Sequence, residues 1–240
     1  MSELVLSSTT TFFSGRIESV FKKAKKHGIK YLEIQPYRWT TPEEVLKLEK
    51  KYGIEVAGIH LPIWWQTPQQ VLTRTLMGRL LTIVCEFYIG PAVTSPAFAI
   101  AEALNNRRPY FLIHSDIIPD MGKERFDSLK EKFNVVVENV PGEDILKLKN
   151  VAPLVFDAGH YGPHPQIEDA YRQMKPDIYH VSYEHRFLYA HDLPDESEQK
   201  TMQRLFQIHE PKYIVLETYP WVSIKKGVQL ILKMILNPPL

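Results

Sequence analysis

The fold is decided by residues 31–61, which read YLEIQPYRWTTPEEVLKLEKKYGIEVAGIHL. The stretch begins and ends with short runs rich in Ile, Leu, Val and Tyr, which are typical of buried β-strands. Between these runs, Thr41-Pro42-Glu43-Glu44 supplies an N-cap, a proline in the first turn and acids near a helix N-terminus, and Gly53 supplies a C-terminal stop. The stretch therefore predicts a strand–helix–strand unit of the α/β class.

The same alternation of apolar runs with amphipathic segments continues along the chain. Upstream, Arg16–His27 has its apolar residues on one helical face, and Gly28 ends that helix. Strand-like runs recur at Leu4–Ser8, Tyr31–Gln35, Val56–Leu61, Tyr110–Ser115, Asn134–Asn139, Pro153–Asp157, Ile178–Ser182 and Tyr213–Thr218. Eight such runs with helical crossovers favour a single (β/α)8 TIM barrel, with parallel strands closed into a barrel inside a ring of helices.

One interval is longer than a single crossover helix requires. Between the third and fourth strand-like runs we predict a long helix from Pro68 to about Tyr88 and a second helix over Ser95–Asn105. A ninth strand over Thr82–Ile89 is the alternative. Because no low-complexity tract or Pro/Gly/Ser-rich linker divides the sequence, we interpret residues 1–240 as one domain.

Composition excludes several classes of protein. The 29 Lys and Arg residues nearly balance the 28 Asp and Glu residues, so the chain has no global basic field to attract nucleic acid. Cys85 is the single cysteine, which rules out an intramolecular disulfide and a cysteine-rich zinc module. The chain shows neither a signal-peptide pattern nor an apolar stretch long enough to span a membrane, so we expect a cytoplasmic protein that does not use a membrane as partner.

Seven consecutive strand-like runs finish with an acid or an imidazole set in apolar sequence. These residues are Glu33, His60, His114, Glu138, Asp157, His180 and Glu217. A lone histidine at a strand end is more often structural than a ligand, but in a parallel barrel all these ends meet at one mouth. Buried carboxylates are costly without a partner, so the recurrence predicts a divalent cation there. With no thiolate available, imidazole and carboxylate ligands suit Zn²⁺, Mn²⁺ or Fe²⁺, with Mg²⁺ or Co²⁺ as alternatives.

An ordered series of residues resembles the xylose isomerase-like barrel superfamily, which includes sugar isomerases, sugar epimerases and AP endonuclease family 2, the endonuclease IV type of apurinic-site nuclease. The series is His60-x-Pro62, His114, Glu138-Asn139, Asp157-x-x-His160, His180 and Glu217. The resemblance covers nearly the whole chain, although no single motif in it is very specific.

The epimerase branch of this superfamily implies one metal ion and a sugar or sugar phosphate as substrate. The implied ligands are Glu138, Asp157, His180 and Glu217. The two glutamates would also act as the acid/base pair on opposite faces of the substrate carbon. His160 and Arg186 occupy the positions that steady the substrate oxygens in that branch.

The nuclease branch implies more metal ions and a nucleic-acid substrate. A second ion would share the glutamate of the fifth strand and be bound by His60 and His114. A third ion would be bound by His160, His191 and an aspartate two residues before His191, but this chain has Tyr189 there. The third site is therefore a remnant, which puts a three-zinc nuclease in doubt. Two metal ions would still suit phosphoester hydrolysis.

Candidate substrate contacts follow the second and third strands. Glu33, Arg38, Trp64 and Trp65 could reach a substrate, because aromatic side chains at a barrel mouth can stack on a sugar ring or on a nucleobase. The alternative is that they pack on the barrel rim. The sequence thus leaves three hypotheses: a metal-dependent sugar isomerase or epimerase, an AP endonuclease-like phosphodiesterase, and a non-catalytic metal-binding barrel.

Overall fold

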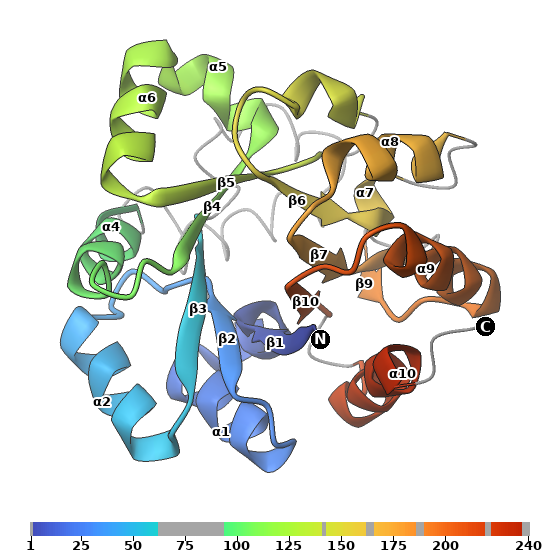
Figure 1. The fold of residues 1–240 in the computed structure, drawn as a ribbon. Coiled ribbons are helices and arrows are strands. Elements are labelled where there is room, and N and C mark those ends of the chain that lie inside the picture. Colours follow the sequence, from blue (N-terminus) through green and yellow to red (C-terminus); the bar gives the residue numbers. More distant parts are fainter. Residues whose placement is uncertain are drawn as a thin grey trace, which may run out of the picture.

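Eight parallel strands close into a barrel in the computed structural model, which describes residues 2–61, 94–140, 143–161, 166–185, 190–218 and 222–236 (Figure 1). The strands are β1 (Glu3–Ser7), β2 (Tyr31–Ile34), β3 (Glu55–His60), β4 (Tyr110–His114), β5 (Asn134–Glu138), β6 (Leu154–Asp157), β7 (Ile178–Val181) and β10 (Tyr213–Leu216). Their order around the barrel follows the sequence, and β1 closes it by pairing with both β2 and β10. The predicted TIM barrel is confirmed, and each strand agrees with its predicted run to within two residues at either end.

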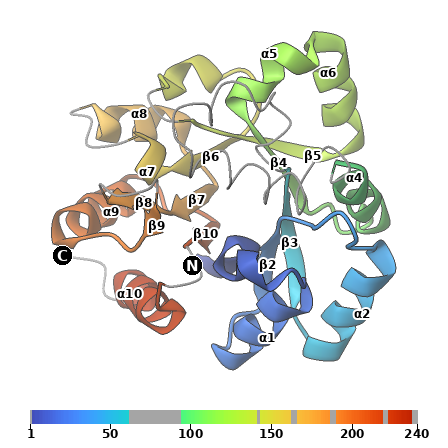
Figure 2. The same ribbon diagram turned by 180° about the vertical axis from the view of Figure 1, so that it is seen from behind.

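Helices surround the strands on the outside of the barrel (Figures 1 and 2). They are α1 (Glu18–Lys26), α2 (Pro42–Tyr52), α4 (Thr94–Ala103), α5 (Ile118–Met121), α6 (Lys123–Lys132), α7 (Ala158–Tyr161), α8 (Ile167–Met174), α9 (Glu196–Ile208) and α10 (Ile224–Leu236), with short 3₁₀ turns η1 (Ser8–Ser14), η4 (Ser115–Ile117) and η5 (Ile145–Leu148). Within the described ranges, no helix has the length and apolar character needed to cross a membrane.

The helix signals of the opening stretch act as predicted. The Thr41 hydroxyl accepts a hydrogen bond from the backbone N–H of Glu44, and Gly53 ends α2 with a φ of 65°. The helix predicted over Ser95–Asn105 is confirmed as α4. The long helix predicted from Pro68 and its alternative, a strand over Thr82–Ile89, lie outside the described residues.

A small antiparallel pair that the sequence did not predict follows β7. It consists of β8 (Tyr183–His185) and β9 (Ala190–Asp192), with Glu184 opposite His191 (Figure 2). Each strand has only three residues, which is too short for a clear alternation of apolar and polar residues in the sequence.

Side chains of each strand alternate between two apolar layers. On β4, Phe111 and Ile113 face the surrounding helices, while Tyr110 and Leu112 belong to a separate cluster inside the barrel. Strands of period two produce this division along their whole length. On β2 to β7 and β10, the next inward position beyond the apolar interior is at the C-terminal end of the strand, and the polar residues predicted for the mouth occupy it.

Candidate metal centre

Seven inward side chains at the C-terminal ends of β2 to β7 and β10 form a buried polar layer, which we call the rim cluster. Its members are Glu33, His60, His114, Glu138, Asp157, His180 and Glu217, none of them more than 3% exposed. Each lies two positions beyond an inward-facing position on its strand, so the strand period carries it to the same level of the barrel. The predicted convergence of these residues at one mouth is therefore present.

Four members of the rim cluster form one group. One ligand atom each from Glu138, Asp157, His180 and Glu217 lies within 4.8 Å of the others. His180 Nδ1 is 2.9 Å from Glu138 Oε1 and 2.8 Å from Glu217 Oε2. Ligand atoms that share an ion at about 2.0–2.2 Å are separated by about 3 Å, so these spacings suit a common cation.

A second group shares Glu138 with the first. The Nε2 atoms of His60 and His114 are 3.0 Å apart, and His114 Nε2 is 3.1 Å from Glu138 Oε2. His60 Nε2 lies 3.6 Å from the same oxygen. Because Oε1 of Glu138 faces His180 and Oε2 faces His114, one carboxylate lies between the two groups.

Buried N and O atoms of the rim cluster that lack a hydrogen-bond partner indicate whether a cation would fit there. Within the described part of the chain, four of the seven buried side-chain N and O atoms without a hydrogen-bond partner belong to it. They are Glu33 Oε1, His60 Nδ1, Glu138 Oε2 and His180 Nδ1. Buried polar atoms rarely remain unsatisfied in native proteins, and His180 Nδ1 has two carboxylate oxygens nearby without the geometry of a hydrogen bond. Imidazole nitrogens and carboxylate oxygens suit Zn²⁺, Mn²⁺ or Fe²⁺, so these residues could hold a divalent metal.

Comparison with known proteins gives matches in structure alone. No family model matches the sequence, and a search of curated proteins finds no match. AP endonuclease, family 2, from Brucella melitensis is 13% identical over 95% of this chain and 97% of its own, with a TM-score of 0.62. IolI protein with a binding zinc atom is 14% identical over 98% and 97%, with a TM-score of 0.61. The probable 3-DHS dehydratase AsbF from Bacillus anthracis is 15% identical over the whole of both chains, with a TM-score of 0.55.

The chain has the closed (β/α)8 barrel fold that these solved structures share. At these identities the similarity shows the fold alone, so the chemistry of this barrel has to be argued from its own rim cluster.

The carboxylates and histidines of the rim cluster shift one another's pKa values and stabilise one another's charged forms. Burial by itself would raise the pKa of Glu33, but His180 and His60 outweigh it and lower the pKa to about 2. Burial likewise opposes ionisation of Glu138, yet His180 and His114 bring its pKa well below the ordinary value. Burial would lower the pKa of His180, but Glu33 and Glu138 raise it well above the usual value. Without a cation, imidazolium protons therefore balance the buried carboxylates.

This balance makes metal binding dependent on pH. Because the pKa of His180 is raised, His180 is protonated at pH 7 in the metal-free protein and must release that proton to ligate an ion. We expect Zn²⁺ affinity to rise by about tenfold per pH unit for each proton released as pH increases from 6 to 8. Calorimetric titration in buffers of different ionisation enthalpy measures the proton count. A Zn²⁺ affinity that stays constant over this range would contradict the expectation.

Asp157 is held by three polar neighbours, of which only Ser182 was not named in the sequence series. The Ser182 hydroxyl donates to Asp157 Oδ2 at 2.5 Å, and the backbone N–H of His160 donates to Oδ1 at 3.0 Å. The Asn139 side chain forms two hydrogen bonds with the Asp157 backbone, at 2.9 and 3.0 Å. Position along the strands could have indicated these residues, because Ser182 lies two residues beyond His180 on the inward side and Asn139 follows Glu138 directly.

His160, predicted as a substrate contact or as a ligand of a third ion, lies on α7 next to this shell. Its Nδ1–H donates to the Asn139 carbonyl at 2.8 Å, which directs Nε2 away from that bond. Burial would lower the pKa of His160, but Asp157 and Glu138 outweigh it and raise the pKa to about 9. His160 is therefore a cationic neighbour of the first group in the metal-free protein.

The other residues predicted to contact substrate or to belong to a third ion site lie in several parts of the chain. Arg38 is exposed in the loop after β2, where Trp39 stacks on Tyr37 with ring centroids 5.6 Å apart. Glu33 is buried, and Tyr110 from the layer beneath donates to its carboxylate. Trp64, Trp65, Arg186 and Tyr189 lie outside the described residues, as does the side chain of His191 on β9.

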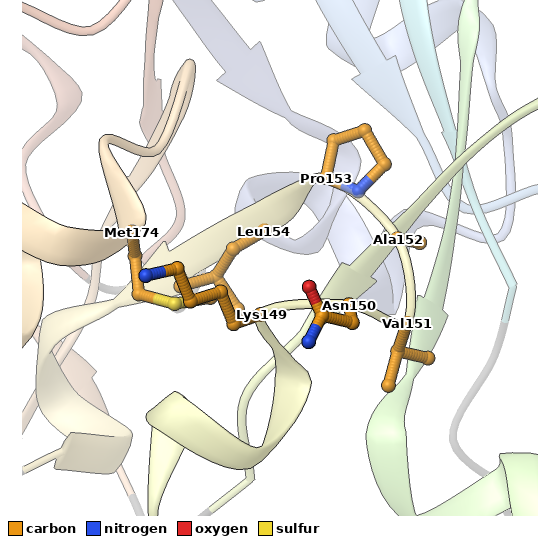
Figure 3. Close-up of a pocket in the computed structure, with 7 residues that line it drawn as sticks. All are labelled: Lys149, Asn150, Val151, Ala152, Pro153, Leu154 and Met174. Carbon is orange, nitrogen blue, oxygen red and sulfur yellow. The ribbon is translucent and has the colours of Figure 1, made fainter.

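A cavity of about 390 Å³ lies away from the rim cluster, beside the start of β6 (Figure 3). Residues Lys149–Leu154 and Met174 line it, and Leu154 is at the opposite end of β6 from Asp157. No acid or histidine is among these lining residues, so this cavity lacks the groups that the rim cluster offers.

Proposed function

We propose that this chain is a divalent-metal-dependent isomerase or epimerase of sugars or sugar phosphates. The proposal depends on one observation: Glu138, Asp157, His180 and Glu217 bring four ligand atoms within 4.8 Å of one another at the mouth of the barrel. Active sites of TIM-barrel enzymes lie at this end of the strands. The zinc atom in the structure of IolI, which has the same fold, supports metal binding by this chain.

The two glutamates are the groups that move the proton. Both approach His180 Nδ1, Glu138 at 2.9 Å and Glu217 at 2.8 Å, so both carboxylates would lie beside a substrate bound to an ion at this group. Glu138 is the candidate base, because an ionised carboxylate beside the substrate can accept a proton from carbon. Glu217 is placed to return a proton to the other face.

The remaining residues bind and shield the reacting atoms. Glu138, Asp157, His180 and Glu217 would hold the divalent ion, which would supply Lewis-acid chemistry toward the carbonyl group of a bound sugar. His160, cationic beside Asp157, is placed to steady a developing negative charge. The buried rim keeps the glutamates away from bulk water, which strengthens their electrostatic interactions.

Solvent exchange tests the proposal. We expect protein loaded with Zn²⁺ or Mn²⁺ to incorporate deuterium from D₂O at the carbon beside the carbonyl of at least one sugar or sugar phosphate in an aldose and ketose panel. We expect Glu138→Gln and Glu217→Gln each to lower the exchange rate by about 10²–10⁴-fold, the usual contribution of a general acid or base. Mass spectrometry measures the incorporated deuterium.

The control is Glu55→Gln, an exposed carboxylate at the opposite end of β3, which we expect to leave the exchange rate unchanged. Absence of exchange across the panel, in protein that carries at least one metal ion per chain, would overturn the isomerase proposal.

A second candidate is metal-dependent phosphodiester hydrolysis. The observation in its favour is the group of His60, His114 and Glu138, which supplies a second ion position beside the first. Two adjacent ions suit in-line displacement at phosphorus. The similarity in fold to an AP endonuclease of family 2 makes abasic duplex DNA the substrate to assay. Chelator-sensitive nicking with two ions per chain would favour this candidate, and metal binding without either activity would favour the non-catalytic barrel.

A further inference from the structure

Glu33 contacts both metal-binding groups without belonging to the four-residue group. Its side chain, at the end of β2, is fully buried. Oε2 lies 3.0 Å from His180 Nε2, and Oε1 lies 3.5 Å from His60 Nδ1. One carboxylate thus faces a histidine of the first group with one oxygen and a histidine of the second group with the other.

Tyr110 supports this carboxylate from below. Its hydroxyl donates to Glu33 Oε2 at 2.8 Å. The ring reaches Glu33 across β3, because Gly58 leaves the space: a Cβ on Gly58 would lie 2.1 Å from two ring carbons of Tyr110. Burial raises the pKa of Tyr110 well above its ordinary value, so the hydroxyl remains a donor at neutral pH.

The hydrogen bonding of His180 decides which nitrogen can ligate. A neutral imidazole has one N–H and one lone pair, and the partner of one nitrogen fixes the role of the other. When Nε2–H of His180 donates to Glu33, Nδ1 presents its lone pair between Glu138 and Glu217. Glu33 therefore selects the tautomer that the first group requires.

The same carboxylate faces His60 in a corresponding way. When Nδ1–H of His60 points to Glu33 Oε1, Nε2 presents its lone pair toward Glu138 Oε2 and His114. Both Glu33 Oε1 and His60 Nδ1 lack another hydrogen-bond partner within the described ranges, so nothing competes with this approach.

We propose that Glu33 is a positioning residue that fixes the tautomers and ring orientations of His180 and His60, and thereby prepares both groups to bind metal. The inference rests on the proposed function only in requiring that the rim cluster binds a divalent ion. Carboxylate partners of ligating histidines set ring orientation and ligand basicity, and their loss costs about 10–100-fold in metal affinity.

The decisive variant is Glu33→Gln, tested in the full chain with Zn²⁺ as probe. An amide keeps the size of the carboxylate but cannot accept from both imidazoles, because its NH₂ group is a donor. We expect Zn²⁺ affinity to fall by about 10–100-fold with the number of bound ions unchanged at saturation. In ¹⁵N spectra of zinc-loaded wild-type protein, we expect His180 protonated at Nε2 and His60 at Nδ1. In the variant we expect both signals to shift or broaden.

Two internal controls accompany the spectra. His27 and His209 lie near the opposite end of the barrel, after α1 and α9, and their signals should not change. Tyr110→Phe keeps the carboxylate but removes its hydroxyl donor, so we expect a smaller loss of affinity, below about tenfold, and shifts in the same two histidines. If the Glu33→Gln variant does not fold, Tyr110→Phe tests by itself whether Glu33 positions His180 and His60.

Unchanged affinity and unchanged histidine signals in the folded variants would overturn the inference. Loss of one bound ion in Glu33→Gln would also overturn it, because Glu33 would then be a ligand, as its place with His60 and Glu217 in a third group allows. Wild-type protein that binds no Zn²⁺ would overturn both this inference and the proposed function. Wild-type protein that binds Zn²⁺ but exchanges no deuterium would overturn the isomerase proposal alone.

Discussion

Replacing Glu138 with glutamine is expected to remove metal binding from both groups, with a loss of Zn²⁺ affinity of more than about 100-fold, beyond the 10–100-fold that outer partners of ligands contribute. The reason is its position: Oε1 faces His180 in the first group and Oε2 faces His114 in the second. An amide keeps the volume but offers one weaker acceptor in place of two charged oxygens. Elemental analysis of dialysed protein and calorimetric titration with Zn²⁺ measure the change.

Matched variants separate this loss from unfolding. Glu55→Gln changes the same functional group at the exposed N-terminal end of β3 and should leave metal content unchanged. Saturating Zn²⁺ should raise the unfolding temperature of wild-type protein, because an ion that binds only the folded state stabilises it, and this shift should vanish in Glu138→Gln. Wild-type metal content in a folded Glu138→Gln protein would contradict the assignment of Glu138 as a shared ligand.

Replacing Gly58 with alanine is expected to destabilise the barrel by about 2–3 kcal/mol, near the upper end of the usual cost of overpacking a core. The added Cβ would lie 2.1 Å from Cε2 and Cζ of Tyr110, and this ring is buried inside the barrel. Urea unfolding of the metal-free protein measures the change in free energy. Because the displaced Tyr110 hydroxyl would leave Glu33, Zn²⁺ affinity should fall as well.

A double-mutant cycle identifies the cause. Tyr110→Ala removes the ring that Gly58→Ala would meet, so adding Gly58→Ala to Tyr110→Ala should cost much less than adding it to the wild type. The expected coupling is about 1–3 kcal/mol, as for residues in direct contact. Additive effects of the two substitutions would show that the clash with Tyr110 is not the source of the loss.

Most of the barrel could be predicted from local sequence. Strand length, helix caps and the alternation of apolar runs with amphipathic segments are local properties, and they located all eight barrel strands. The convergence of Glu138, Asp157, His180 and Glu217 then followed from topology, because the ends of parallel strands meet at one mouth.

The partners of Glu33 could not be predicted in this way. The sequence placed it at a strand end and suggested contact with substrate, but its partners come from β7, β3 and β4 across the barrel interior. That arrangement depends on one ring crossing one glycine, Tyr110 over Gly58, which no spacing along the chain reveals. The strands β8 and β9 were not predicted for another reason. Three residues are too few to show the alternation of apolar and polar side chains that identifies a strand.

The separation of the barrel interior into an apolar level and a polar level bears on how such a chain can diverge. Apolar residues of similar volume replace one another in a core at small cost, so the positions that build the barrel carry little residue-specific information. Only a handful of positions at the mouth demand a particular side chain. Two chains of this architecture can therefore share a backbone at 13–15% identity, because substitutions at the apolar positions change the sequence while the shape of the barrel is kept.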